Sequence, residues 1–152
     1  MLTITTKFVH INIIAHDWKR LAQFYQKVFG CLPLHPERDL SGEWLGQGTG
    51  VANARIRGIH LTLPGYERGG PTLEIFQYSY LENKPETVAN RPGYTHIAFS
   101  VNSVQAVRDA VIQEGGRDLG RIVTHEIPGA GEITFTYMTD PEGNIIELQQ
   151  WT

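Results

Sequence analysis

The chain contains two segments in which strand-like spacing of apolar residues gives way to helix-like spacing. The first reads FVHINIIAHDWKRLAQFYQKVFG from Phe8, and the second reads YTHIAFSVNSVQAVRDAVIQEGG from Tyr94. Each opens with a run typical of a strand and continues with apolar residues three and four positions apart, which predicts an amphipathic helix. The segments align at a constant offset of 86 positions, which places His10 over His96. We interpret them as two copies of one strand–helix unit.

Both predicted helices carry capping signals at their ends. Asp17 is a suitable N-cap for the first helix, and Gly30 is placed to end it. Ser103 is the corresponding N-cap candidate of the second helix, which Gly115 and Gly116 close. The two helices therefore occupy equivalent places in the two copies.

Further strand-like runs follow each helix and are separated by turn residues. They are GEWLG, ARIRGIHLTLPG and PTLEIFQY in the first half, and RIVTHEI, EITFTYMTD and NIIELQQW in the second. The DPEG sequence at 140–143 suits a type I turn and predicts a hairpin between its flanking strands. The pattern as a whole predicts an α+β protein of two tandem βαβββ modules. We expect module one at 7–80, a polar linker at 81–93 and module two at 94–152, within a single domain 1–152.

The last strand of each half carries a glutamate at the same place. TLEIFQY aligns with IIELQQW, so that Glu74 lies over Glu147. Glutamate is depleted from strands, and an exposed edge strand is the simplest explanation for one. Apolar neighbours on both sides instead predict sheltered carboxylates, which cost several kcal/mol unless a cation neutralises them. A divalent metal held by two imidazoles and two carboxylates, His10 and His96 with Glu74 and Glu147, balances the charge.

The remaining histidines and one tryptophan lie outside this repeated pattern. Three histidines without a partner at the repeat offset are expected at the surface or in turns: His16, His35 and His125. His60 lies in a predicted strand and is a candidate for the lining of a substrate pocket. Trp44 is expected either to pack in the core or to reach that pocket.

Composition narrows the class of partner and the compartment. The 152 residues carry 13 basic and 16 acidic side chains, a net charge of −3, with no long run of either sign, so neither nucleic acid nor an anionic membrane is favoured as a partner. Cys31 is the only cysteine, which excludes an intrachain disulfide and favours a cytoplasmic location. We expect Cys31 to be a small buried apolar residue. The start of the sequence lacks a signal-peptide pattern, and no stretch of about 18 apolar residues occurs.

Five quoted segments give the chain a resemblance to a known family. FVHINI, FYQKVFG, PTLEIFQY, YTHIAFSV and DPEGNIIELQQW together resemble the vicinal oxygen chelate superfamily over residues 7–152. This superfamily includes glyoxalase I, methylmalonyl-CoA epimerase, extradiol dioxygenases, fosfomycin-resistance enzymes and bleomycin-binding proteins. The resemblance implies two modules whose curved sheets surround one metal site, with a ligand from the first and last strand of each module. Those places hold His10, Glu74, His96 and Glu147.

The resemblance also implies a chemistry and an assembly. One divalent ion (Zn, Ni, Co, Mn, Mg or Fe) that chelates two adjacent oxygens of a small substrate stabilises an enolate as a carbon-bound proton leaves. Glu147 is then the first choice for the base that moves this proton, and Glu74 the second. A metal-dependent lyase or isomerase of the glyoxalase I or epimerase type is expected, and it is expected to assemble as a homodimer.

Departures from the family patterns keep alternatives open. The epimerase branch carries a further acidic base in its first module, and here the nearest acid is Glu43, a third candidate for the pocket beside Trp44 and His60. An extradiol dioxygenase and a drug-binding or metabolite-binding protein without enzymatic activity are the alternatives. The substrate itself is not identified, because its specificity is expected to come from loops at 34–50, 64–71 and 125–132.

Overall fold

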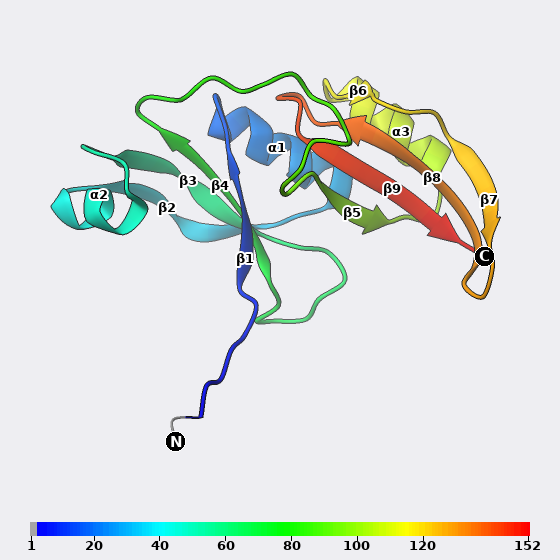
Figure 1. Cartoon of the computed structure of the whole chain (residues 1–152), viewed down its shortest axis with the longest axis horizontal. Coiled ribbons are helices and arrows are strands. Elements are labelled where there is room, and N and C mark those ends of the chain that lie inside the picture. The colour runs from blue at the N-terminus through cyan, green and yellow to red at the C-terminus, as the bar shows by residue number, and fades with distance from the viewer. Residues whose placement is uncertain (1–2) are drawn as a thin grey trace. The chain divides into compact units, whose positions relative to one another are not determined.

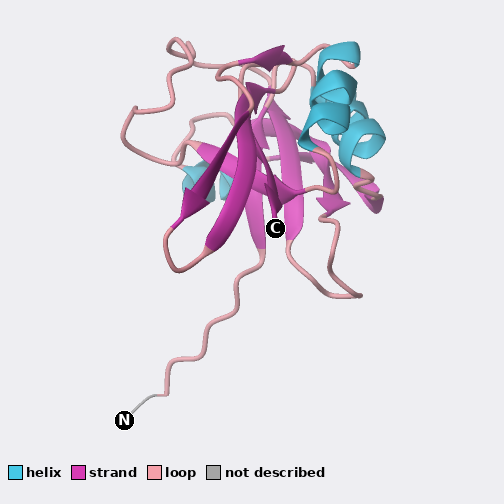
Figure 2. Ribbon diagram, turned by 90° about the vertical axis from the view of Figure 1, so that its right-hand side faces the viewer, coloured by secondary structure: helices cyan, strands magenta, loops and turns pink. Residues whose placement is uncertain are grey.

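The computed structural model describes residues 3–152, which form three helices and nine strands arranged in two mixed sheets (Figures 1 and 2). In chain order the elements are β1 (His10–Ile14), α1 (Trp18–Phe29), β2 (Pro33–Ser41), α2 (Glu43–Thr49), β3 (Arg55–Thr62), β4 (Thr72–Tyr78), β5 (His96–Ser100), α3 (Val104–Gln113), β6 (Arg117–Asp118), β7 (Val123–Ile127), β8 (Gly131–Thr139) and β9 (Ile145–Trp151). The predicted α+β fold of two strand–helix–strand modules is confirmed.

The chain divides into two compact units, one ending at Glu82 and the other spanning Asn83–Thr152. The boundary falls inside the segment 81–93 that the sequence suggested as a linker. The part of this segment from Asn83 onward belongs to the second unit, where Lys84 Nζ donates to Asn144 Oδ1 at 2.7 Å and Thr87 Oγ1 donates to the carbonyl oxygen of Gly143 at 2.8 Å. No helix within residues 3–152 is long and apolar enough to cross a membrane.

The first unit contains a four-stranded sheet in the order β1-β4-β3-β2. β1 pairs with β4 in parallel, and the other pairs are antiparallel. Helix α1 begins after Asp17, whose side chain accepts from the backbone N–H of Arg20, and ends at Gly30 in the left-handed region with φ of 70°. Both predicted caps are confirmed. The helix packs on β3 and β4.

Alternation along β3 and β4 decides which side chains meet that helix. Ile59 and Leu61 on β3, and Leu73 and Ile75 on β4, are at most 4% exposed and form the core beneath α1. Successive side chains of a strand point to opposite faces. The residues between these apolar ones therefore lie on the other face of the sheet, and one of them is Glu74.

The segment 34–50 differs from the sequence-based expectation, which was a loop with a short strand at GEWLG. Most of it is regular structure: β2 pairs with β3, and GEWLG forms the start of helix α2, with Gly42 as the N-cap. Leu45 of α2 is buried with Ile56 and Phe76, and this apolar cluster stabilises a helix where a strand was expected. Trp44 is 61% exposed, so the expectation that it packs in the core is wrong. Its Nε1 donates to the carbonyl oxygen of Ser41 at 2.9 Å.

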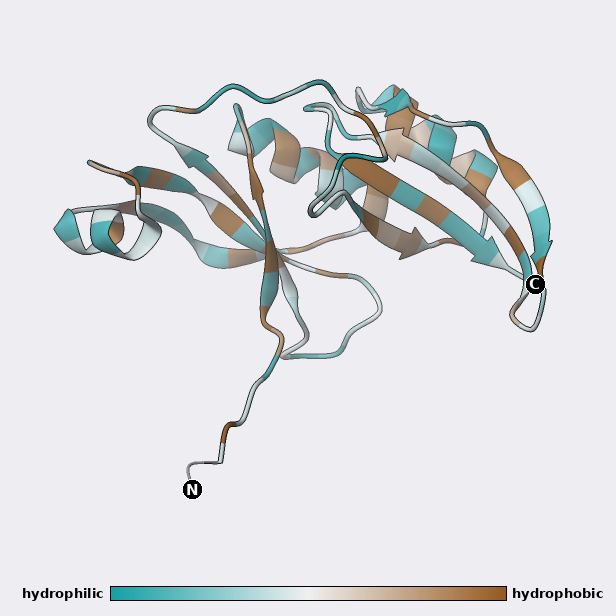
Figure 3. Ribbon diagram, viewed as in Figure 1, coloured by the Kyte–Doolittle hydropathy of each residue, from teal (hydrophilic) through white to brown (hydrophobic). Residues whose placement is uncertain are grey.

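The second unit repeats the plan with a sheet in the order β5-β9-β8-β6, while β7 pairs with β8. Ser103 caps α3 by accepting from the backbone N–H of Ala106, and Gly115 follows the helix with φ of 95°, as predicted. The residues of the DPEG turn join β8 to β9 in the predicted hairpin. Alternating apolar and polar bands are visible along β9 in Figure 3. Ile146 and Leu148 are fully buried, and Glu147 between them lies on the opposite face.

Candidate metal centre

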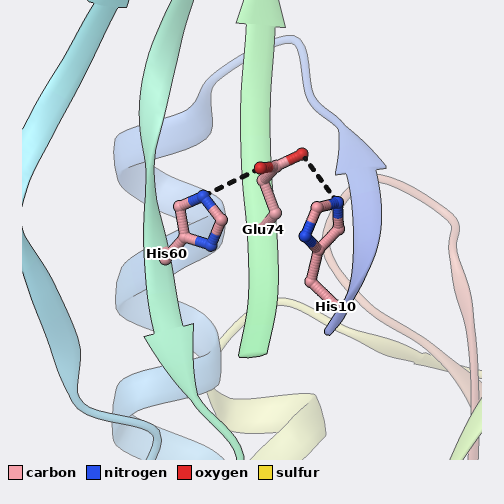
Figure 4. A group of neighbouring side chains, drawn as sticks. All are labelled: His10, His60 and Glu74. Atoms are coloured by element: carbon pink, nitrogen blue, oxygen red, sulfur yellow. Dashed lines mark ion pairs between the residues drawn. The ribbon is translucent and has the colours of Figure 1, made fainter. Parts of the chain in front are cut away.

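Three side chains from adjacent strands of the first unit meet on the sheet face opposite α1 (Figure 4). His10 comes from β1, Glu74 from β4 and His60 from β3. Nε2 of His10 lies 3.6 Å from Oε1 of Glu74, and Nε2 of His60 lies 2.8 Å from Oε2. One ligand atom from each residue lies within 4.8 Å of the others, so this group can hold a metal ion.

Neighbouring polar groups hold Glu74 and His60 in place. Asn12 Nδ2 donates to Oε1 of Glu74 at 2.8 Å, and Nδ1 of His60 lies 3.0 Å from Oγ1 of Thr72. The side chain of Glu74 is only 12% exposed, which confirms that this carboxylate is sheltered. β4 lies between β1 and β3. The explanation of Glu74 as a water-facing residue of an edge strand is therefore wrong.

His60 is predisposed to the neutral form that metals bind. Burial lowers the pKa of His60 below its usual value, although the nearby Glu74 carboxylate acts in the opposite direction. The charges of Arg38 and His10 act in the same direction as burial. A neutral imidazole keeps a lone pair on one ring nitrogen, which can be offered to a cation or to a hydrogen-bond donor.

The second unit contains one histidine–glutamate pair. Nε2 of His96 on β5 lies 3.3 Å from Oε2 of Glu147 on β9, and the Glu147 side chain is 14% exposed. The ring of Tyr137 on β8 lies 4.8 Å from the ring of His96, between centroids. As in the first unit, the carboxylate lies on the sheet face opposite the helix.

Strand register shows that the two pairs occupy equivalent places. On the parallel pair β1–β4, Asn12 is opposite Glu74; on β5–β9, Ala98 is opposite Glu147. Ala98 follows Asn12 by the offset of 86 that aligns the two histidines. On the antiparallel side, His60 is opposite Glu74 and Tyr137 is opposite Glu147. The sequence repeat is therefore also a repeat of strand pairing around each glutamate.

His60 is the residue whose position the sequence alone left least defined. It was a candidate for the substrate pocket, because it lies in a predicted strand. The signal that identifies it is cross-strand pairing, since directly opposed residues bring their Cβ atoms within about 5.5 Å. That pairing depends on the register of β3 against β4, which a single sequence does not specify.

The donor set suits a divalent ion. Each pair supplies one imidazole nitrogen and one carboxylate, which are the ligands that zinc and other first-row divalent metals accept. The two carboxylates are largely buried, and their nearest cationic candidates are histidines that carry no fixed charge. A cation bound by these residues would compensate the buried negative charge.

A family model described as the Glyoxalase/Bleomycin resistance protein/Dioxygenase superfamily matches residues 7–148. The chain belongs to this superfamily. Members of the superfamily bind small molecules and typically bind a metal.

Individual relatives agree with the superfamily assignment. An Arabidopsis thaliana protein named Glyoxylase I 4 is 27% identical over 145 residues, which span 94% of this chain and 70% of that protein. A glyoxalase family protein from Bacillus cereus superposes with a TM-score of 0.82 at 16% identity, covering 98% of this chain and 96% of the other. A glyoxalase/bleomycin resistance protein/dioxygenase family enzyme from Burkholderia phytofirmans PsJN gives a TM-score of 0.59 at 15% identity, covering 94% and 97%. The two structural likenesses show the fold alone.

The other candidate residues of this superfamily member lie on α2 or at the surface. Glu43 is the exposed first residue of α2, and Trp44 follows it. The ring of Phe76, which belongs to the apolar cluster under α2, lies 5.9 Å from the ring of His60 between centroids. The apolar cluster therefore borders the His60 side of the centre. The three remaining histidines are exposed, as expected: His16, His35 and His125.

Proposed function

We propose that this protein is a metal-dependent lyase or isomerase of the glyoxalase I or epimerase type. The observation that carries the proposal is the matched strand register of the two histidine–glutamate pairs, His10 with Glu74 and His96 with Glu147. Similarity to a protein named Glyoxylase I 4 supports the same reaction class. The substrate is expected to be small, with two adjacent oxygens or a thioester next to an acidic C–H bond.

The ligands of the proposed divalent ion are these four side chains. The structure describes each pair within its own unit. The proposal requires that one His10–Glu74 pair and one His96–Glu147 pair bind the same ion. The two pairs come either from one chain or from two copies of it. When bound, such an ion supplies Lewis acidity that stabilises negative charge on substrate oxygens. The side chains of His10 and His96 are 41% and 29% exposed, so both imidazoles are accessible to an entering ion.

The proton transfer is assigned to a carboxylate of this chain. We assign it to Glu147, which takes a proton from the substrate carbon and returns it to a neighbouring position. Its neighbours Ile146 and Leu148 are fully buried, which fixes the strand while the carboxylate faces the other side. A positioned base of this kind contributes about 10²–10⁴-fold to the rate.

Exchange of a substrate proton with solvent deuterium tests this assignment. The full chain is screened in D₂O with glutathione hemithioacetals, acyl-CoA thioesters and catechols in the presence of several divalent metals. Glu147→Gln is expected to lower exchange into a turned-over substrate by about 10²-fold or more. Glu126→Gln, at an exposed position of β7, is the matched control and is expected to keep wild-type exchange. Full exchange in Glu147→Gln would move the role to Glu74 or Glu43.

One observation favours a second candidate, an extradiol-type dioxygenase. The group His10, His60 and Glu74 offers two imidazoles and one carboxylate within a single unit, the donor set of many non-haem iron(II) oxygenases. Oxygen-dependent ring cleavage of a catechol that requires iron(II) and is lost in His60→Gln would favour this candidate over the first.

The remaining assignments from the sequence stay predictions. They are homodimer assembly, a cytoplasmic location and, as a third candidate function, small-molecule binding without enzymatic activity. A chain that binds a small molecule tightly without any metal would favour the binding protein.

A further inference from the structure

We propose that His60, supported by Thr72, is a positioning residue that anchors Glu74 as a metal ligand, and that Glu147 has no counterpart of this support. This inference rests on the proposed function, because Glu74 is one of the ligands of that site. It assigns a role to a residue that lies outside the repeated pairs.

The two oxygens of Glu74 have different neighbours. Oε2 lies 2.8 Å from Nε2 of His60, which is a normal hydrogen-bond distance. Oε1 lies 3.6 Å from Nε2 of His10 and accepts a hydrogen bond from Asn12. In Figure 4 the carboxylate lies between the two imidazoles, with one oxygen toward each. Oε1 is therefore the oxygen that shares its surroundings with His10, and Oε2 is the oxygen held by His60.

The distances separate a ligand from a hydrogen-bond donor. Two atoms that bind one ion at about 2.0–2.1 Å lie about 2.9–3.4 Å apart, depending on the coordination angle. The separations between each first-strand histidine and its glutamate, 3.6 Å in the first unit and 3.3 Å in the second, are close to this range. The His60–Glu74 separation of 2.8 Å is shorter than both and fits an N–H···O bond.

The two partners of His60 define its tautomer. The Glu74 carboxylate only accepts hydrogen bonds, so the proton of a neutral ring resides on Nε2, which donates it to Oε2. The Thr72 hydroxyl lies 3.0 Å from Nδ1 and donates to that nitrogen. Thr72 precedes Glu74 by two positions on β4, so both side chains lie on the same sheet face. The resulting Thr72–His60–Glu74 chain satisfies both ring nitrogens of His60 with hydrogen bonds.

The second unit carries different side chains at the matching positions. Ala98, which has no side-chain donor, stands where Asn12 stands in the first unit. Tyr137 stands where His60 stands, and its ring lies against His96. The same strand pairing thus presents Glu74 with an amide and an imidazole, and Glu147 with a methyl group and a phenol. This difference leaves Glu147 without the support that Asn12 and His60 give to Glu74.

The test uses the full chain loaded with ¹¹³Cd, whose coupling to ¹⁵N identifies imidazoles bound directly to the metal. We expect coupling to His10 and His96 and none to His60, whose long-range ¹H–¹⁵N spectrum should show a proton on Nε2. Coupling to His60 would overturn this inference and leave the metal site intact. A wild-type chain that binds no cadmium, nickel or zinc would overturn both the inference and the proposed function.

Variants of the two positioning residues provide a second readout that does not depend on activity. Loss of a side chain that orients a metal ligand typically lowers metal affinity by about 10–100-fold. We expect such a loss in His60→Leu, and partial rescue in His60→Gln, whose amide nitrogen can still donate to Oε2. Thr72→Ser, which keeps the hydroxyl, is expected to match wild type, whereas Thr72→Val should lower affinity. Equal affinity in wild type, Thr72→Val and His60→Leu would contradict the positioning role.

Discussion

Asn12 lies directly opposite Glu74 on the neighbouring parallel strand, and its Nδ2 donates a 2.8 Å hydrogen bond to Oε1 of that carboxylate. The equivalent position in the second unit is Ala98, opposite Glu147. The two glutamates thus share a backbone setting and differ in the side chains around them.

The first prediction concerns this amide. Asn12→Ala removes a donor to a charged group, a bond typically worth about 1.5–3 kcal/mol. Metal affinity is therefore expected to fall about 10-fold or more, as measured by competition with a chromophoric chelator. Asn90→Ala, at an exposed site outside the strands, is the control and should leave affinity unchanged. Unchanged affinity in Asn12→Ala would show that Asn12 does not orient the carboxylate.

The second prediction concerns the pH dependence of stability in the metal-free protein. Burial lowers the pKa of His60 below the ordinary value of 6.5, so the unfolded chain binds a proton at a pH where the folded chain does not. The free energy of unfolding should therefore decrease as the pH falls below about 6.5. Urea unfolding between pH 5 and 8 measures this slope. His60→Gln should reduce the slope and His125→Gln should preserve it; an identical slope in wild type and His60→Gln would refute the assignment.

The third prediction concerns Cys31. This thiol is fully buried, and burial raises its pKa to about 11. Because the thiolate is the reactive form, the folded protein should react very slowly with a thiol reagent at pH 8. The same chain in urea should react at the rate of an ordinary exposed thiol. Equal rates in the folded and unfolded states would contradict the burial of Cys31.

The fourth prediction concerns the close approach of β3 and β4 beside the centre. A Cβ at Gly58 would overlap the carbonyl oxygen of Ile75 and lie 2.5 Å from Cδ1 of Phe76. Gly58→Ala is therefore expected to destabilise the fold by about 1–3 kcal/mol in urea unfolding. Gly48→Ala is the matched control, because nothing lies within 4 Å of its added Cβ and alanine favours a helix. A Gly58→Ala variant as stable as wild type would show that the two strands are less closely packed.

Much of the fold follows from local signals in the sequence. Asp17, Gly30 and Ser103 identify helix ends because capping depends on a few adjacent residues. The internal repeat predicts that His10 and His96 occupy equivalent places, and likewise Glu74 and Glu147. Equivalent positions in the two copies lie in equivalent strand pairs.

What the sequence left undetermined depends on contacts between distant residues. Helix α2 forms where Leu45 packs on Ile56 and Phe76, and the GEWLG segment by itself does not reveal this contact. His60 joins Glu74 through the register of two antiparallel strands, and that register is a property of the whole sheet. Local pattern therefore predicted the paired ligand candidates, and tertiary packing added the third imidazole.

Metal binding by the full chain tests the central claim, that His10, Glu74, His96 and Glu147 hold one divalent ion. Protein purified without chelators is dialysed against Ni²⁺, Zn²⁺ or Co²⁺, and the retained metal is measured for wild type, His10→Gln, His96→Gln and the exposed-site control His125→Gln. We predict about one ion per chain in wild type and in His125→Gln, and a large loss in the other two variants, because each lacks one imidazole ligand. A wild-type chain that retains no ion, or equal retention by all four proteins, would contradict the claim.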